Sequence, residues 1–218
     1  MFAERWKMER IWVLDTEGSG GSPNEPIQLA AVEMVGFEIT GKAHLWNFRP
    51  KGEITPFATR VHGIRNSDAV RWPSFSDQED EIRQILGGTA IAGHAVNVEL
   101  DMVASGMADW SPARAFCTLR MARRIHPAQK RHKLTVLTAQ YGLIDAVGRM
   151  TGRRPHDALY DATATALLLS RFHEDEGERF HRLLEASDVM ASRRSQHEAA
   201  ARKARQAELK RIARESRA

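Results

Sequence analysis

The stretch RIWVLDTE at residues 10–17 decides the fold that this sequence predicts. Its first five residues are rich in Ile, Trp and Val, which is typical of a short buried strand that ends at Asp15. The next segment, GSGGSPNEP at residues 18–26, indicates a loop. Because alternate residues of an extended segment point to the same side, we expect Asp15 and Glu17 to lie side by side where the strand ends.

Working outward, the pattern predicts two more strands at residues 27–35 and 42–48, then short strands at 89–92 and 115–117. Helices are predicted at residues 56–61, 75–86, 97–107, 118–125, 134–141 and 158–172. Three strands come first, and strands then alternate with helices. This order predicts an α/β protein with a mixed sheet that is flanked by helices.

Composition favours a protein that stays in the cytoplasm. The 218 residues are 42% hydrophobic, which suffices for one substantial core. Cys117 is the single cysteine, so an internal disulfide is excluded and a reducing compartment is expected. No apolar run is long enough to span a bilayer, and the first residues lack the apolar core of a secretory signal. We therefore expect no membrane association.

Positive charge is concentrated at the C-terminal end. The formal net charge is +4, yet residues 191–218 alone hold nine Lys/Arg and three Asp/Glu. We expect a body over residues 1–175 and a helical, basic tail over 176–218. The tail fits either a segment that contacts nucleic-acid phosphates or a solvated helix.

Carboxylates in three places have the spacing of a metal site. Asp15 and Glu17 repel each other unless a cation lies between them, and hard divalent cations prefer such oxygen ligands. Asp101 lies four residues after Asn97, so both are expected on one helix face. Each of these patterns, taken alone, is also typical of an ordinary charged surface.

The third place is RPHDALYDATATALLL at residues 154–169. Asp157 is a plausible first residue of a helix, and Asp161 falls on the apolar stripe of that helix. A carboxylate that faces a core is costly unless it is paired or bound to metal. His156, five residues before Asp161, is therefore a candidate catalytic residue.

Taken in order, the three motifs resemble the DEDDh family of 3′→5′ exonucleases. The resemblance covers residues 10–172 and extends to ITPFATRVHGI at residues 54–64. Within the family, residues 116–143 and 156–169 are most similar to exodeoxyribonuclease X, and the family includes the proofreading subunit of DNA polymerase III. The resemblance implies a ribonuclease H-like fold and assigns residues 1–175 to the exonuclease domain.

The resemblance also implies a catalytic set and a cofactor. Asp15, Glu17, Asp101 and Asp161 are expected to bind two Mg²⁺ or Mn²⁺ ions, and His156 is expected to act as general base. The expected reaction is hydrolysis of a phosphodiester with release of nucleoside 5′-monophosphates.

The expected partner is a single-stranded 3′ end, with DNA favoured over RNA and DNA repair as the setting. By family analogy, Thr16, Gly18, His62, Ile64 and Asn97 contact this strand. An exoribonuclease similar to ribonuclease T or oligoribonuclease is the alternative, and a non-catalytic adaptor is a more distant one. The oligomeric state stays open.

The second motif departs from the family pattern. The family often has His directly before the Asn and Phe directly before the Asp. Here Val96 precedes Asn97, His94 lies two residues further upstream, and Leu100 precedes Asp101. In addition, Gln28 stands where a Glu is common.

Overall fold

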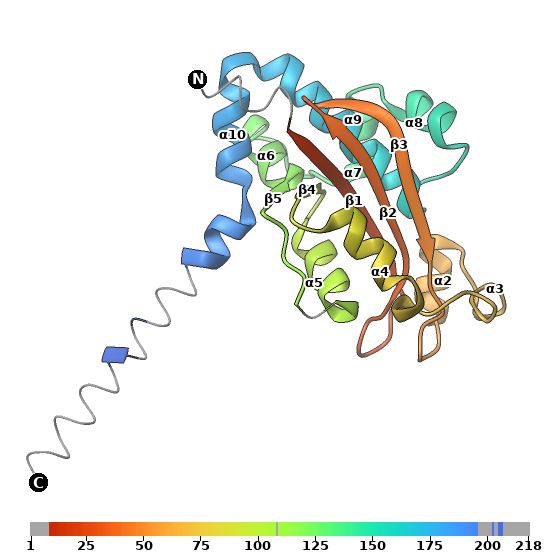
Figure 1. Ribbon diagram of the computed structural model, residues 1–218. Coiled ribbons are helices and arrows are strands. Elements are labelled where there is room, and N and C mark those ends of the chain that lie inside the picture. Colours follow the sequence, from red (N-terminus) through yellow and green to blue (C-terminus); the bar gives the residue numbers. More distant parts are fainter. Residues whose placement is uncertain (1–8, 108, 196–201, 203–204, 207–218) are drawn as a thin grey trace, which may run out of the picture.

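The computed structural model describes residues 9–107, 109–195, 202 and 205–206. A five-stranded sheet in the order β3-β2-β1-β4-β5 forms its centre (Figure 1). The strands are β1 (Arg10–Gly18), β2 (Pro26–Val35), β3 (Glu38–Asn47), β4 (Ala90–Gly93) and β5 (Arg114–Cys117). β1, β2 and β3 pair antiparallel, whereas β1, β4 and β5 pair parallel, so the predicted mixed sheet is confirmed.

Helices cover both faces of the sheet (Figure 1). They are α2 (Pro56–His62), α3 (Asn66–Ala69), α4 (Phe75–Leu86), α5 (Asn97–Gly106), α6 (Thr118–Ile125), α7 (Leu134–Gln140), α8 (Ile144–Thr151), α9 (Ala158–Glu176) and α10 (Phe180–Ser187), with a 3-10 turn at Gly177–Arg179. The sequence pattern did not predict α3 or α8, whereas α10 lies within the segment 176–218 that was expected to be helical.

Alternation along β1 divides the core into two layers. Ile11 and Val13 face the layer that contains α9, whereas Trp12 and Leu14 face the layer that contains α4 and α5. All four side chains are buried, because β1 lies between β2 and β4. Asp15 and Glu17 continue the first of these two sets of positions, so they point toward the layer of α9.

The body continues past the boundary expected at residue 175. Phe180 and Leu184 of α10 are buried in the same core cluster as α9, and α10 packs against α6 and β5. Asp188 is also buried, and it accepts hydrogen bonds from Arg114 Nε at 3.1 Å and from the backbone N–H of Ala115 at 3.2 Å. Residues 177–190 are therefore part of the packed body. Of residues 191–218, where the positive charge is concentrated, most lie outside the described residues.

One local feature differs from the sequence expectation. β1 extends to Gly18 and so carries Asp15 and Glu17 within the strand itself. In the part of the chain that the structure describes, no helix has the length and apolar character needed to cross a membrane.

Candidate active site

The end of β1 presents two crowded carboxylates. Asp15 pairs across the ladder with Ala30 and Glu17 pairs with Gln28, so the side chains of Asp15 and Glu17 lie on the same face. Burial, followed by the charges of Asp161 and Asp157, raises the pKa of Glu17 to about 8. Burial also raises the pKa of Asp15 well above its usual range. The end of β1 therefore carries carboxylates whose negative charge is poorly solvated.

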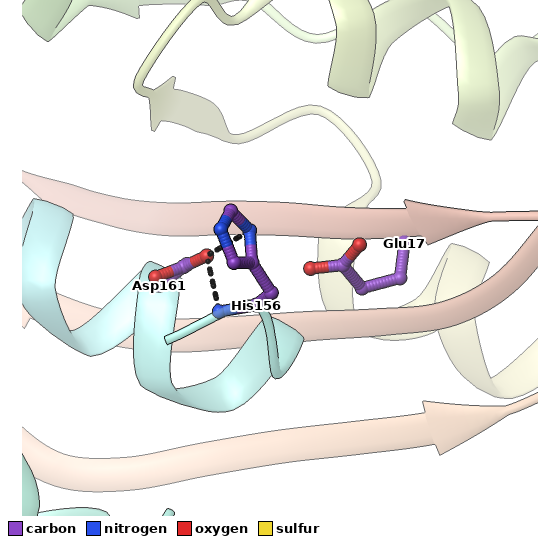
Figure 2. A group of neighbouring side chains, drawn as sticks. All are labelled: Glu17, His156 and Asp161. Atoms are coloured by element: carbon purple, nitrogen blue, oxygen red, sulfur yellow. Dashed lines mark hydrogen bonds and ion pairs between the residues drawn. The ribbon is translucent and has the colours of Figure 1, made fainter. Parts of the chain in front are cut away.

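The first turn of α9 brings Asp161 to the same place. The side chain of Asp157 caps the helix by accepting from Leu159 N–H at 3.0 Å. Asp161, one turn further along, is only 7% exposed and faces β1. Oxygen and nitrogen atoms of Glu17, His156 and Asp161 lie within 4.8 Å of one another (Figure 2). The inward Asp161 and the adjacent histidine that the sequence predicted thus come together.

His156 is held in a strained conformation beside this cluster. Its φ of 66° lies in the left-handed region, which costs a non-glycine residue about 1–2 kcal/mol. In that conformation its backbone N–H donates to Asp161 Oδ2 at 3.1 Å, and its Nδ1 lies 3.9 Å from the same oxygen (Figure 2). The half-exposed ring therefore stands next to the carboxylates and remains open to water.

Gln28 ties the helix that carries Asp161 to the sheet. Its Oε1 accepts from Ala158 N–H at 2.8 Å, and its Nε2 donates to Asn47 Oδ1 at 2.9 Å. A neutral amide both accepts and donates here, so the first turn of α9 is anchored without adding another carboxylate. The Gln in place of a Glu therefore has a structural reason.

A fourth carboxylate comes from α5, and it is Glu99. Glu99 is 3% exposed, and it is the charged neighbour with the largest effect on the pKa of Asp15. Burial, followed by the charges of Asp101 and Glu17, raises the pKa of Glu99 itself to about 8. A Cβ added at Gly93 would lie 3.3 Å from the Glu99 carboxyl carbon, so the glycine that ends β4 lets Glu99 approach β1.

The structure does not bring Asp101 into this cluster. The Asp101 side chain is 72% exposed, and its Oδ1 accepts from Arg193 Nη2 at 3.0 Å. Two residues along a helix correspond to a rotation of about 200°, so Glu99 and Asp101 cannot face the same way. The structure therefore places Glu99 in the carboxylate cluster, where the sequence pattern had led us to expect Asp101.

In the sequence, His94 indicates how the second motif aligns with the family pattern. In the family pattern the acidic residue comes five positions after the histidine, and five positions after His94 is Glu99. Val98 then takes the place of the Phe, and Ala95 that of the Asn. If the Asn of the family pattern is instead aligned with Asn97, the expected acidic residue moves two positions along the chain, from Glu99 to Asp101.

Three of the predicted strand-binding residues surround the carboxylates. Thr16 lies between Asp15 and Glu17, and its buried Oγ1 has no hydrogen-bond partner among the described residues. Gly18 ends β1, and a Cβ there would lie 2.5 Å from Asn24 Oδ1. His62 is buried, its Nδ1 accepts from Ile64 N–H at 3.0 Å, and its Nε2 has no described partner. Burial lowers the pKa of His62, which disfavours the charged form of its ring.

The remaining two residues lie differently. Ile64 is partly buried and packs on a small cluster with Ile27 and Ile54. Asn97 lies on the outer side of α5, where its Oδ1 accepts from Arg193 Nη2 at 3.1 Å. The structure therefore places Asn97 with Asp101, and not with the carboxylate cluster.

The cluster fits divalent cations. Asp161 Oδ1 and Glu99 Oε2 are buried without a hydrogen-bond partner in the described part of the chain, although buried carboxylate oxygens rarely lack one. Four crowded carboxylates, two from β1 and one each from α5 and α9, are stable together only when they are protonated or neutralised by cations. Exonucleases of the DEDDh type use divalent metal ions, and these oxygen donors are of the right kind.

Comparison with known proteins identifies the class. Residues 12–169 match the model of an exonuclease family, the one named after ribonuclease T. The chain belongs to this family, and its fold and site define a 3′→5′ exonuclease.

Among curated proteins, the chain is 28% identical over 183 residues to DNA polymerase III subunit epsilon of Buchnera aphidicola, with 76% of this chain and 73% of that protein covered. It is 27% identical over 169 residues to the Escherichia coli subunit epsilon, covering 71% and 67%. Among solved structures, exonuclease X in complex with 5′ overhanging duplex DNA superposes with a TM-score of 0.65 and 25% identity, covering 83% of this chain and 99% of that one.

Proposed function

We propose that this exonuclease removes nucleotides one at a time from the 3′ end of DNA and releases nucleoside 5′-monophosphates. One observation carries the proposal: Asp15, Glu17, Glu99 and Asp161 converge from the end of β1 and from two helices, with the His156 ring beside them. Crowding four carboxylates without a cation does not stabilise the folded protein. Burial and the repulsion between neighbouring carboxylates raise the pKa of each carboxyl group. This arrangement suits a site whose charge is balanced by cations.

Asp15, Glu17, Glu99 and Asp161 would hold two divalent cations, Mg²⁺ or Mn²⁺. When bound, such ions stabilise the negative charge on the attacking and leaving oxygens of an in-line displacement. The chain contributes the rest of the chemistry through the positions of its own side chains. The anchor from Gln28 to Ala158 and the close approach at Gly93 keep Asp161 and Glu99 in place as the substrate binds.

His156 would act as the general base. The attacking water approaches the scissile phosphate beside the carboxylates, and the imidazole accepts its proton, a role worth about 10²–10⁴-fold in rate. Because the His156 side chain is 52% exposed, the proton then passes to solvent. Thr16, Gly18 and His62 would face the terminal nucleotide, whereas contact of Ile64 with a base stays a prediction.

DNA is the favoured substrate because of the relatives. Two of the similar curated proteins are DNA polymerase III epsilon subunits, and exonuclease X was solved with DNA. RNA is the alternative, since a 3′-exonuclease that recognises a histone mRNA stem-loop shares the fold at a TM-score of 0.62 and 17% identity. Only contacts at the 2′ position separate the two sugars.

The test is digestion of 5′-labelled single-stranded DNA and RNA of one sequence, with Mg²⁺ or with EDTA. We expect a ladder that shortens from the 3′ end of the DNA, slower digestion of the RNA, and no product with EDTA or after a 3′ phosphate is added. Asp161→Asn serves as the inactive control. Shortening from the 5′ end, or digestion in EDTA, would overturn the proposal, and faster digestion of the RNA would replace DNA by RNA.

A further inference from the structure

A pocket of about 610 Å³ opens directly beside the proposed catalytic residues. His156 and Asp161 form one part of its wall, and the other part comes from α6, the loop before α7 and the end of β4. Its charged and imidazole side chains besides those two are His94, Arg123, Lys130, Arg131, His132 and Lys133.

The cations of this pocket lack carboxylate partners. None of Arg123, Lys130, Arg131 and Lys133 forms an ion pair with another described residue, and Asp161 is the acidic side chain in the lining. The segment at residues 117–134 contains six Lys/Arg and no Asp or Glu. By contrast, residues 1–190 as a whole carry 23 basic and 25 acidic side chains. Positive charge is thus concentrated in a pocket that adjoins Asp161 and His156.

The loop that carries three of these cations is held in place by a partly buried histidine, His94. His94 Nε2 lies 2.8 Å from the carbonyl oxygen of His132, and His94 Nδ1 lies 2.9 Å from Thr118 Oγ1. Burial lowers the pKa of His94 to about 4, so the ring is neutral. A proton on Nε2 then donates to His132, and Nδ1 accepts from the Thr118 hydroxyl. His132 Nε2 in turn donates to the His126 carbonyl at 3.0 Å, which closes the loop.

We propose that this basic pocket binds the phosphate backbone of the substrate strand next to the scissile phosphodiester. The inference rests on the proposed function, because it takes the carboxylate cluster as the place of hydrolysis. Lys and Arg side chains on a preordered loop contact phosphates without reading bases, so the pocket would hold the strand independently of its sequence. His94 is then a positioning residue, since it acts through the loop and not on the strand.

The experiment compares Lys130→Gln/Arg131→Gln with a control that removes the same charge elsewhere, Lys42→Gln/Arg171→Gln. Neither Lys42 nor Arg171 lines the pocket. Each protein is assayed with Mg²⁺ on a 12-nucleotide single-stranded DNA and on the p-nitrophenyl ester of thymidine 5′-monophosphate, which has no neighbouring phosphate. Inhibition by thymidine 5′-monophosphate is measured on the ester.

For the pocket variant we expect KM on the 12-nucleotide strand to rise about tenfold, with an effect on the ester at least fivefold smaller. Loss of two phosphate contacts should also flatten the plot of log affinity against log salt by about 1.4. The control variant should match the wild type in both respects.

Three results would overturn the proposal. An unchanged strand KM would show that the pocket does not hold the backbone. Equal losses on both substrates would place Lys130 and Arg131 at the scissile group itself. Weaker inhibition by the mononucleotide with an unchanged strand KM would assign the pocket to the released product. If the wild type cleaves neither substrate, the proposed function fails, and strand affinity measured by fluorescence anisotropy in EDTA still tests the pocket.

Discussion

Two opposite faces of α5 carry carboxylates in different environments. Glu99 is buried against the end of β4, where it interacts with Asp15, and its pKa rises to about 8. Asp101, half a turn further around the helix, is exposed and pairs with Arg193 from the C-terminal segment. The residue type that the family pattern favours, an aspartate, lies outside, and a glutamate lies inside. Position relative to the sheet therefore decides which carboxylate belongs to the active site.

The sharpest test of this comparison is a matched pair of amide substitutions. Glu99→Gln should lower kcat by about 10³-fold, because cation-dependent stabilisation of the transition state is worth several kcal/mol. Asp101→Asn should keep kcat within about twofold, since a solvent-exposed ion pair is worth at most about 1 kcal/mol. Single-turnover digestion of single-stranded DNA measures both. If the two results were exchanged, Asp101 would be the ligand.

His156 offers the next largest effect. His156→Ala should lower kcat by about 10²–10⁴-fold while leaving strand affinity in Ca²⁺ unchanged, because the imidazole moves a proton and does not hold the strand. His156→Gln is the companion variant, and it should be equally slow. A variant that bound the strand more weakly and kept its rate per bound complex would contradict the assigned role.

The carboxylate cluster, which includes Glu99 on the buried face of α5, should also dominate the pH dependence of stability. The carboxyls of Glu17 and Glu99 titrate near pH 8 in the folded, metal-free protein, against 4.5 in the unfolded chain. Between these values the folded state binds more protons than the unfolded state, so the free energy of unfolding falls as pH rises. In EDTA we expect Tm to drop by about 5 °C or more from about pH 5 to about pH 8.

Glu99→Gln should flatten this slope, whereas Asp101→Asn should leave it as in the wild type. Adding Mg²⁺ should raise Tm most at the alkaline end, where the carboxylates are charged. Thermal unfolding followed by circular dichroism across this range measures all three effects. A metal-free protein that became more stable toward pH 8 would show that the four carboxylates do not crowd one another.

The outer face of α5 should give the smallest effect. Arg193→Ala removes the donor to both Asn97 and Asp101, and it should lower the free energy of unfolding by no more than about 1 kcal/mol. Activity on a short strand should be unchanged. Urea unfolding measures the change in stability, and the digestion assay measures the activity. Arg194→Ala is the control in both. A large loss of activity would mean that the C-terminal segment supports the active site through α5.

Much of this arrangement was predictable from local patterns. The alternation in residues 10–17 placed Asp15 and Glu17 on one face, and the apolar stripe of residues 158–169 turned Asp161 inward. The strong periodicity at residues 75–86 and 118–125 gave the bounds of α4 and α6 as the structure has them. By contrast, α8 is short and follows another helix closely, so no change of periodicity indicated it.

The sequence by itself determined which reactive side chains are present. It also determined the face of the strand or helix on which these side chains lie. Periods of two and of 3.6 residues settle those faces locally, as they did for Asp15, Glu17 and Asp161. The periodicity of α5 did not decide between Glu99 and Asp101, because both faces of the helix are acidic and its rotation is set by packing against β1, about 80 residues away in the chain. The five-residue spacing from His94 pointed to Glu99, and the tertiary structure decided for it. The basic pocket likewise depends on the tertiary structure. Its cations are visible in the sequence, but their place beside Asp161 depends on His94, which joins the loop before α7 to the end of β4.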